Sequence, residues 1–535
     1  MENEIYYNLT LGIDFGTSGA RAIIVDGDRQ IAHFDVSLPA PERIDNHSEQ
    51  NPEAWQKALN QLLEQVQQAG FAPYIRHIIG DATSSTVLVT DDQGQTLSSA
   101  LMYDDARAQT QAERIRQNGQ SDSAAQGANS TLAKLMWLGD HYPHNSQILH
   151  QIDWLNFQLC GVMGVTDENN ALKLGYDSIH QAWPDWVVAL CPFSLPKVVA
   201  AGTPIAKVDK KLVTAWGFAP DCQVYAGTTD SIAAFLASGA HQIGDAVTAL
   251  GSTLAIKLLS DRPIFAAQYG IYSHKLWDKW LVGGASNAGG AVLLQHFSLE
   301  EMQTLIPKLD MTTASGLDTY PLTRPGERFP IADPQLAPKI PPTQDSVLLL
   351  KALIEGLVEV ERQAYQKLEQ LGAPAVKQIF GVGGGSRNQA WSDLRALRLP
   401  AKLATPISQD AAYGVTRLLK ETSMNTEQLI EQLNQHPVDF KQVMQVIESE
   451  YDFTPTAFQN GDTFNEMNTN NGSCKIFAFA QMHQLSEQAT LNAFGDFYTQ
   501  DVLQNPDGED HQNIRNFIKH GWQGIEFKGQ ALTKK

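Results

Sequence analysis

The pattern of apolar and polar positions in the first 100 residues predicts alternating strands and helices. Residues 11–26 form two apolar runs around a Gly-Thr-Ser-Gly turn, and a third strand is expected at 30–38. Apolar residues from Trp55 to Val66 then recur at the spacing of one helical face. Another apolar run, 74–81, leads to a Thr/Ser turn and a further strand. Such alternation is typical of an α/β protein, in which helices cover a sheet.

The same pattern begins again near residue 223. A strand ending in Thr-Thr-Asp and a helix of small residues lead to GDAVTALGSTLAIKLLS (244–260), with two apolar runs around Gly-Ser-Thr. A strand, a glycine turn and a helix follow at 378–397. The repeat lies in the pattern and not in residue identity, and it predicts two related α/β halves.

The character of the chain changes after about residue 422. No strand-like alternation is visible there, and the apolar spacing predicts helices separated by turns rich in Asn, Gly and Asp. We therefore expect a small, mainly α domain at the C-terminal end. The expected domains are residues 1–230, 231–422 and 423–535.

Charge and composition narrow the classes of function. The 535 residues carry a net charge of −20, which argues against broad binding to nucleic acid or to anionic membranes. There is no apolar run long enough to span a bilayer, and the acidic, polar start MENEIYYNLT is not a signal peptide. The four cysteines lack metal-site spacing and are expected to be free, buried thiols, so the expected location is the cytoplasm.

Two short turns resemble each other and suggest phosphate binding. Gly16-Thr17-Ser18 and Gly251-Ser252-Thr253 each join two apolar strands, at equivalent places in the two halves. Either one alone would be read as an ordinary turn. Together they suggest that backbone N–H groups and hydroxyls of both halves hold a polyphosphate. Asp14 precedes only the first turn, which favours a role beside magnesium and the transferred phosphate over a structural cap.

The glycine turn at 381–388, GVGGGSRN, joins a strand to a helix. Glycines allow close approach of a ligand to the backbone, and a helix N-terminus favours anions. The sequence is not a Walker A loop, and it departs from G-x-G-x-x-G at Ser386. A tight structural connection is the alternative interpretation.

Two carboxylate-containing segments have both a structural and a functional interpretation. Asp230, in GTTDSIAAF, is either a helix cap or a general base that takes a proton from an attacking hydroxyl. The segment MYDDARA (102–108) is either a solvated loop or a set of sugar contacts, in which carboxylates accept from hydroxyls and Arg107 donates.

These motifs occur in the order found in a known family. LGIDFGTSGARAIIVD, EQNPEAW, GTTDSIAAFLASG, ALGST and GVGGGSRN together resemble the FGGY carbohydrate kinases, of the actin/hexokinase/Hsp70-like ATPase superfamily, over about residues 9–422. The segments NALKLGYD, ASNAGGAV and YPL…GERFPIADP resemble one compact branch, the xylulose-kinase-like proteins of cyanobacteria and plants regarded as D-ribulose kinases. The resemblance implies two actin/hexokinase-like (ribonuclease H-like) domains around a cleft.

The resemblance also implies roles for particular residues. Asp230 would be the catalytic base and a substrate contact, and Asp14 would lie near the sugar and the transferred phosphate and bind Mg²⁺ through water. The remaining sugar-side residues would be Ser18, Gly19, Ala20, Arg21 and Ser84. The ATP-side residues would be Thr17, Gly251, Ser252, Thr253, Gly383, Gly384, Gly385, Ser386 and Arg387. The family signature Trp-x-Asp-x-Arg occurs as Tyr103–Arg107, with tyrosine in place of tryptophan.

The activity implied is ATP- and Mg²⁺-dependent phosphorylation of a ketopentose, with D-ribulose expected first and D-xylulose second. A non-kinase ATPase switch of the same superfamily is the alternative. No nucleic-acid or membrane partner is expected. Residues from about 425 to 535 resemble the HopJ-type family, which implies a fused interaction or regulatory module whose partner is unknown.

Overall fold

The computed structural model describes residues 8–120, 122–419 and 426–535. These residues divide into two compact units, one ending at Leu419 and one covering the C-terminal part. The boundary expected at residue 422 lies outside the described residues. The boundary expected at residue 230 falls at the start of a helix that packs against both large sheets described next.

The first sheet contains the strand with Asp14. Its order is β12-β13-β6-β1-β2-β3, with β14 beside β6. The strands β1, β2 and β3 run antiparallel, whereas β6 lies parallel to β1. Their bounds are β1 Leu9–Phe15, β2 Gly19–Asp26, β3 Arg29–Ser37, β6 Ile75–Ala82, β12 Pro204–Lys207, β13 Gln223–Tyr225 and β14 Thr228–Thr229.

The second sheet repeats this arrangement, as the sequence pattern predicts. Its order is β17-β18-β16-β15-β19-β20, in which β15, β16 and β18 run antiparallel and β19 lies parallel to β15. The strands are β15 Asp245–Leu250, β16 Leu254–Ser260, β17 His274–Leu276, β18 Lys279–Ala285, β19 Gln378–Val382 and β20 Lys402–Ala404. The α/β class and the two related halves are therefore confirmed.

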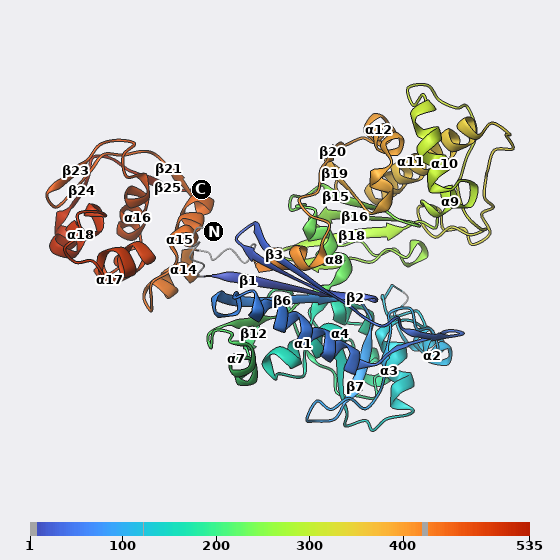
Figure 1. The fold of residues 1–535 in the computed structure, drawn as a ribbon, viewed down its shortest axis with the longest axis horizontal. Coiled ribbons are helices and arrows are strands. Elements are labelled where there is room, and N and C mark those ends of the chain that lie inside the picture. The colour runs from blue at the N-terminus through green and yellow to red at the C-terminus, as the bar shows by residue number, and fades with distance from the viewer. Residues whose placement is uncertain (1–7, 121, 420–425) are drawn as a thin grey trace. The chain divides into compact units, whose positions relative to one another are not determined.

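Two helices lie between the large sheets (Figure 1). They are α8 (Asp230–Ala237) and α13 (Ala411–Thr416), and their apolar residues share one core with residues from both sheets. The opposite face of the first sheet is covered by α1 (Pro52–Gln68), α4 (Gln151–Cys160) and α7 (Lys210–Trp216), and that of the second by α9 (Ala291–His296), α11 (Ser346–Gln370) and α12 (Gln389–Arg398). The layered order fixes the first residue of α8 beside the ends of β1 and β6.

A third sheet belongs to the first half of the chain. Its order is β4-β5-β8-β7-β9, and α2 (Gln109–Asn118) and α3 (Thr131–Gly139) pack against it. The strands are β4 Glu42–Ile44, β5 His47–Gln50, β7 Val87–Thr90, β8 Ala100–Leu101 and β9 Gln147–His150. The remaining strands and α-helices of this unit are β10 Val165–Asp167, β11 Lys197–Val199, α5 Glu168–Ala171, α6 Asp185–Leu190 and α10 Leu299–Leu305.

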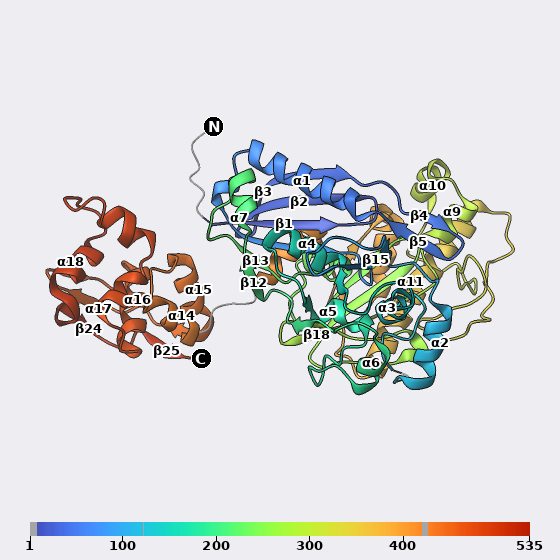
Figure 2. The ribbon, with the colours of Figure 1, turned by 90° about the horizontal axis from the view of Figure 1, so that it is seen from below.

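The C-terminal unit is mainly helical, as predicted (Figure 2). It has its own apolar core. Its helices are α14 Thr426–Leu433, α15 Phe440–Glu450, α16 Asn471–Met482, α17 Glu487–Asn492 and α18 Gln512–His520. Five short strands also occur, which the apolar pattern did not predict. These are β21 Tyr451–Phe453, β22 Phe458–Asn460, β23 Thr463–Asn465, β24 Ile525–Phe527 and β25 Leu532–Lys534. Three-residue strands are too short to show an alternating pattern.

Two further expectations concern the whole chain. Cys160, Cys191, Cys222 and Cys474 are all buried free thiols, which confirms the prediction. Within the described residues, none of the helices has the length and apolar character that crossing a bilayer would require.

Candidate active site

Two carboxylates lie next to each other on neighbouring strands of the first sheet. Asp14 of β1 pairs in register with Asp81 of the parallel strand β6. Asp14 is 4 % exposed and Asp81 is fully buried. Neither carboxylate oxygen of Asp81 has a hydrogen-bond partner among the described residues. Asp81 was not predicted as a site residue, although YIRHIIGD also ends an apolar strand in an aspartate, as LGID does.

Burial raises the pKa values of both carboxyl groups. That of Asp14 rises to about 6 because burial outweighs the opposing effect of Arg21, and Asp230 adds to the rise. The pKa of Asp81 is raised well above its ordinary value by burial and by the charges of Asp14 and Asp230. Two adjacent acids with too few neutralising partners provide oxygen ligands of the type that Mg²⁺ binds. Asp14 and Asp81 therefore fit a magnesium ion held directly or through water.

The first turn lies between β1 and β2, immediately after Asp14. The Gly16 N–H donates to the Gly19 carbonyl at 3.0 Å, which closes the turn and leaves the Ser18 side chain exposed. Arg21 follows on β2, and its Nη1 donates to Asp14 Oδ2 at 2.9 Å. Ala20 is completely buried in the core and pairs with Phe15 and Val36 within the sheet.

The second turn is supported by the loop that ends in α9. The Gly290 N–H donates to the Gly251 carbonyl at 2.8 Å, and the Ala291 N–H donates to the Ser252 carbonyl at 3.2 Å. Glu327 in turn binds the Ser286 hydroxyl at 2.6 Å and the Asn287 N–H at 2.8 Å. The side chains of Ser252 and Thr253 are exposed. The branch segments ASNAGGAV and GERFPIADP thus brace this turn.

The glycine turn forms a short 3₁₀ helix, η5 (Gly384–Arg387), between β19 and α12. Gly383 has a φ of 84°, a conformation that side chains disfavour. A Cβ atom at Gly384 would meet no atom within 4 Å, so its backbone faces open space. Gly383, Gly384 and Arg387 are exposed, whereas Gly385 packs against Leu250 and Trp391. The turn therefore presents bare backbone to a ligand.

Asp230 is the first residue of α8. Its Oδ1 accepts from the Ser231 N–H at 2.6 Å, whereas the preceding Thr229 makes no side-chain cap. Burial raises the pKa of Asp230, against the opposing effects of the Ser231 N–H, Lys257 and Lys173. A carboxyl group that is half-buried, close to Asp14 and raised in pKa is suited to accept a proton near neutral pH.

Lys257 of β16 was not predicted and lies beside Asp230. Its Nζ donates to Ser231 Oγ at 2.8 Å. Burial lowers the pKa of Lys257 to about 8, and Asp230 opposes that change. The apolar alternation of β16 did not predict the contact between Lys257 and Ser231, because this contact depends on how the second sheet packs against α8.

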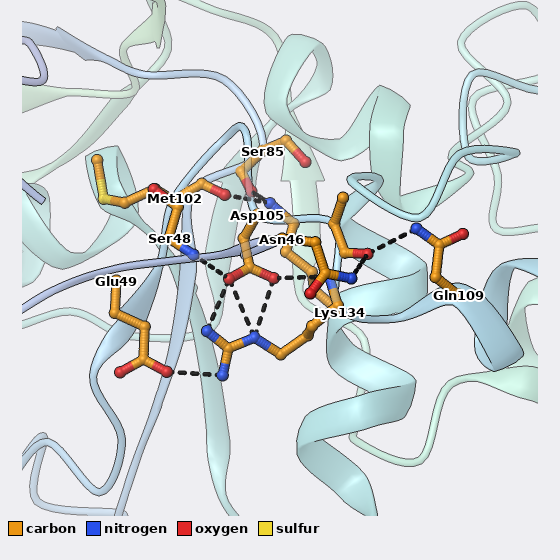
Figure 3. Close-up of polar contacts among 10 residues, drawn as sticks. Asn46, Ser48, Glu49, Ser85, Met102, Asp105, Gln109 and Lys134 are labelled. Atoms are coloured by element: carbon orange, nitrogen blue, oxygen red, sulfur yellow. Dashed lines mark hydrogen bonds and ion pairs between the residues drawn. The ribbon is translucent and has the colours of Figure 1, made fainter. Parts of the chain in front are cut away.

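Within the MYDDARA segment, Asp105 and the Arg107 side chain are buried and bind each other (Figure 3), whereas Tyr103 is exposed. Asp105 is fully buried, and its Oδ2 accepts from Arg107 Nη2 at 2.7 Å and from the Ser48 N–H at 2.7 Å. The Arg107 side chain is 4 % exposed and also binds Glu49 at 2.6 Å. Both interpretations of this segment are therefore wrong for Asp105 and Arg107: they are neither solvated nor free to bind sugar.

A buried lysine holds the turn that contains Ser84. Lys134 of α3 is fully buried, and its Nζ donates to the Ser85 carbonyl at 2.5 Å and to the Met102 carbonyl at 2.8 Å (Figure 3). Burial lowers the pKa of Lys134 to about 7. Ser84 itself is half-buried in the turn after β6. Lys134 therefore ties the Ser84 turn to the start of the MYDDARA segment.

The paired sheets, with turns and carboxylates at their facing ends, define the two-domain actin/hexokinase-like fold of sugar kinases. Solved structures with this fold include a xyloylose kinase from Brucella ovis (TM-score 0.69, 22 % identity, 77 % of this chain and 89 % of that chain) and a xylulose kinase from Rhodospirillum rubrum (TM-score 0.68, 22 % identity, 77 % and 90 %).

The sequence comparison assigns the family. Residues 9–237 match the FGGY family of carbohydrate kinases, N-terminal domain, and residues 246–418 match the C-terminal domain. The chain belongs to the FGGY family of carbohydrate kinases, fused to a domain at 426–532 that matches the HopJ type III effector protein. Similar curated proteins include a xylulose kinase of Staphylococcus xylosus (21 % identity, 76 % of this chain, 89 % of the relative) and a gluconokinase of Bacillus licheniformis (23 %, 75 %, 85 %).

Proposed function

We propose that this carbohydrate kinase phosphorylates a ketopentose, D-ribulose in particular, to give D-ribulose 5-phosphate. The observation that carries the proposal is the position of Asp230, at the start of α8 and electrostatically coupled to Asp14 and Asp81. A base at this point lies near the carboxylates that would hold Mg²⁺. Its neighbour Ser231 accepts a hydrogen bond from Lys257, on the strand that follows the second turn.

In the proposed reaction, Asp230 accepts the proton of the sugar's primary hydroxyl. The hydroxyl oxygen then forms a bond to the γ-phosphorus of ATP, and the bond from that phosphorus to the bridging oxygen breaks, so ADP leaves. Bound Mg²⁺ would neutralise phosphate charge near Asp14 and Asp81. Positioning and charge neutralisation supply most of the rate enhancement in phosphoryl transfer.

The proposed nucleotide contacts come from the turns. Thr17 and the second turn, Gly251–Thr253, would bind phosphates through hydroxyls and backbone N–H groups. Gly383, Gly384, Gly385, Ser386 and Arg387 would line the adenosine side. Support comes from the exposed hydroxyls of the second turn and from the bare backbone at Gly384.

The proposed sugar contacts are Asp230, Asp14, Ser18, Gly19, Arg21 and Ser84, whereas the fully buried Ala20 is left out. The choice of D-ribulose rests on the branch resemblance. Of the three branch segments, ASNAGGAV and GERFPIADP brace the second turn, so they do not bear on the sugar. NALKLGYD lies nearer the proposed base, because its Lys173 opposes the rise that burial causes in the pKa of Asp230. D-Xylulose is the second candidate, because relatives that match 76 % and 80 % of this chain are xylulose kinases.

An ATP-coupled substrate panel tests the proposal. We would measure ADP formation with D-ribulose, D-xylulose, L-ribulose, ribitol and glycerol and compare kcat/KM, which defines specificity. D-Ribulose should give the highest value. A higher value for D-xylulose would reassign the substrate, and ATP hydrolysis that no sugar stimulates would indicate an ATPase switch and reject the kinase proposal.

A further inference from the structure

Lys257 brings a positive charge onto the side of β16 that faces α8. Leu254, Ile256 and Leu258 of this strand point to the opposite side, into the core of the second sheet. Leu259, on the same side as Lys257, packs in the core that includes α8. Lysine is uncommon on a packed face of a strand unless it has a polar partner.

The partner of Lys257 is the residue that follows the proposed base. The ammonium donates to Ser231 Oγ at 2.8 Å, and the Ser231 N–H donates to Asp230 Oδ1 at 2.6 Å. Ser231 Oγ also lies 3.3 Å from Thr229 Oγ1. The second sheet thereby fixes the start of α8 through a side chain that is itself charged.

The hydrogen bond from Lys257 to Ser231 places a positive charge among several charged groups around Asp230. Asp14 of β1 and Asp81 of β6 both interact unfavourably with ionised Asp230. Two cations favour the ionised form of Asp230. They are Lys257 of β16 and Lys173 of η2 (Leu172–Leu174). His274 of β17 lies near both lysines, and its pKa is lowered well below the ordinary value by burial and by their charges, so it stays neutral. Lys257 is anchored by a hydrogen bond to the residue next to Asp230.

We propose that Lys257 is a positioning residue for phosphoryl transfer, which orients the start of α8 through Ser231 and places a positive charge beside Asp230. The inference rests on the proposed role of Asp230 as base. Because β16 begins directly after Thr253, one strand connects the turn that would bind phosphate to the residue beside the base. Lys257 therefore lies on the strand that connects the proposed phosphate-binding turn to the start of α8.

The test compares full-length Lys257→Met and Lys257→Arg with wild type across a pH series. Loss of the ammonium should raise the pKa of Asp230, because a nearby opposite charge shifts a carboxyl pKa by about 1–3 units. The acid limb, the pH range over which kcat/KM for the pentulose falls as the pH is lowered, should therefore move upward by about one pH unit. Activity below that limb should fall about tenfold and recover as the pH rises, while the KM for ATP stays within about threefold. Lys257→Arg should restore the wild-type limb.

The matched control is Lys279→Met, which removes a lysine paired with Asp278 at the β17–β18 turn of the same sheet and should leave the limb in place. Ser231→Ala keeps the ammonium but removes its anchor, and it should move the limb in the same direction by a smaller amount. This variant also provides the test if Lys257→Met does not fold. If the wild type is active and the acid limb stays in place in both Lys257→Met and Ser231→Ala, the inference is wrong. If the wild type forms no ADP in response to a pentulose, the proposed function is wrong instead.

Discussion

Asp230 is the side chain on which the proposed chemistry depends most. We predict that Asp230→Asn lowers kcat for sugar phosphorylation by at least about a hundredfold, because the amide cannot accept the hydroxyl proton. Nucleotide binding should persist, since the turns that would hold ATP are unchanged. ADP formation in a coupled assay and ATP binding by calorimetry measure the two effects.

The control for this variant is Asp345→Asn. Asp345 is also an aspartate at a helix start, where it accepts from the Val347 and Leu348 N–H groups of α11, and asparagine is an equally good N-cap. It should therefore behave as wild type. If Asp230→Asn retained turnover within tenfold of wild type, Asp230 would not be the base.

The buried amine of Lys134 makes a prediction about stability and pH. Burial lowers its pKa from 10.5 to about 7, so between these values the unfolded chain binds a proton that the folded chain does not. The contribution of Lys134 to the free energy of unfolding should therefore rise with pH above about 7, by up to about 1.4 kcal/mol per pH unit. The neutral amine keeps two N–H groups for the Ser85 and Met102 carbonyls.

The measurement is the difference in unfolding free energy between wild type and Lys134→Met at several pH values from about 7 to 10. Taking the difference cancels the other groups that titrate in this range. A difference that stays constant across the series would mean that Lys134 keeps its proton in the folded chain.

Single residues differed in how far the sequence could identify them. Asp14 and Asp230 stand out because each is an acid at the edge of an apolar run. Asp81 carries the same signal and could have been found by it. Lys257 and Lys134 could not, because the partners that give them a role come from α8 and from loops more than 25 residues away along the chain.

At the scale of elements, a buried ion pair joins α11, α12 and β15 beneath the glycine turn. Arg395 of α12 binds Glu361 of α11 through two contacts of 2.8 Å, and both side chains are almost completely buried. Thr248 of β15 donates to Glu361 at 2.6 Å. We predict that Arg395→Met destabilises this unit by about 3–5 kcal/mol, because it leaves the Glu361 charge buried without its partner.

Urea unfolding followed by tryptophan fluorescence measures this loss. Arg362→Met is the matched control, since Arg362 forms a partly exposed pair with Glu359 on the same helix and such a pair contributes at most about 1 kcal/mol. Equal midpoints for Arg395→Met and wild type would show that the buried pair adds nothing to stability.

Strands and helices in which apolar residues recur at a regular spacing were predictable, and very short elements were not. The hairpins at residues 11–26 and 244–260 were clear because each carries two apolar runs around a small-residue turn. The five C-terminal strands gave no signal, because each has three residues and is defined by its partner strand. The MYDDARA segment was misread because a buried Asp105–Arg107 pair has the same sequence as an exposed polar loop.

At the scale of the whole molecule, the described residues form two units with separate apolar cores. The kinase unit has cores on both sheets and between them. The C-terminal unit has one of its own, which includes Phe477, Phe494 and Phe517. A unit that buries its own apolar residues can fold without its neighbour, and the site residues proposed above all lie before residue 388.

We therefore predict that a shortened chain, residues 1–422, folds and retains sugar-kinase activity. Its kcat/KM should stay within about threefold of the full chain, because no proposed catalytic or binding residue is removed. Circular dichroism and the coupled ADP assay would be compared for the two chains at equal concentration. Retained activity would leave the HopJ-type domain as an interaction or regulatory module with a separate partner. Loss of folding or of activity would instead make the HopJ-type domain an integral part of the catalytic unit. All proposed site residues are still present in the shortened chain, so the removed residues would then be needed to stabilise or complete the site.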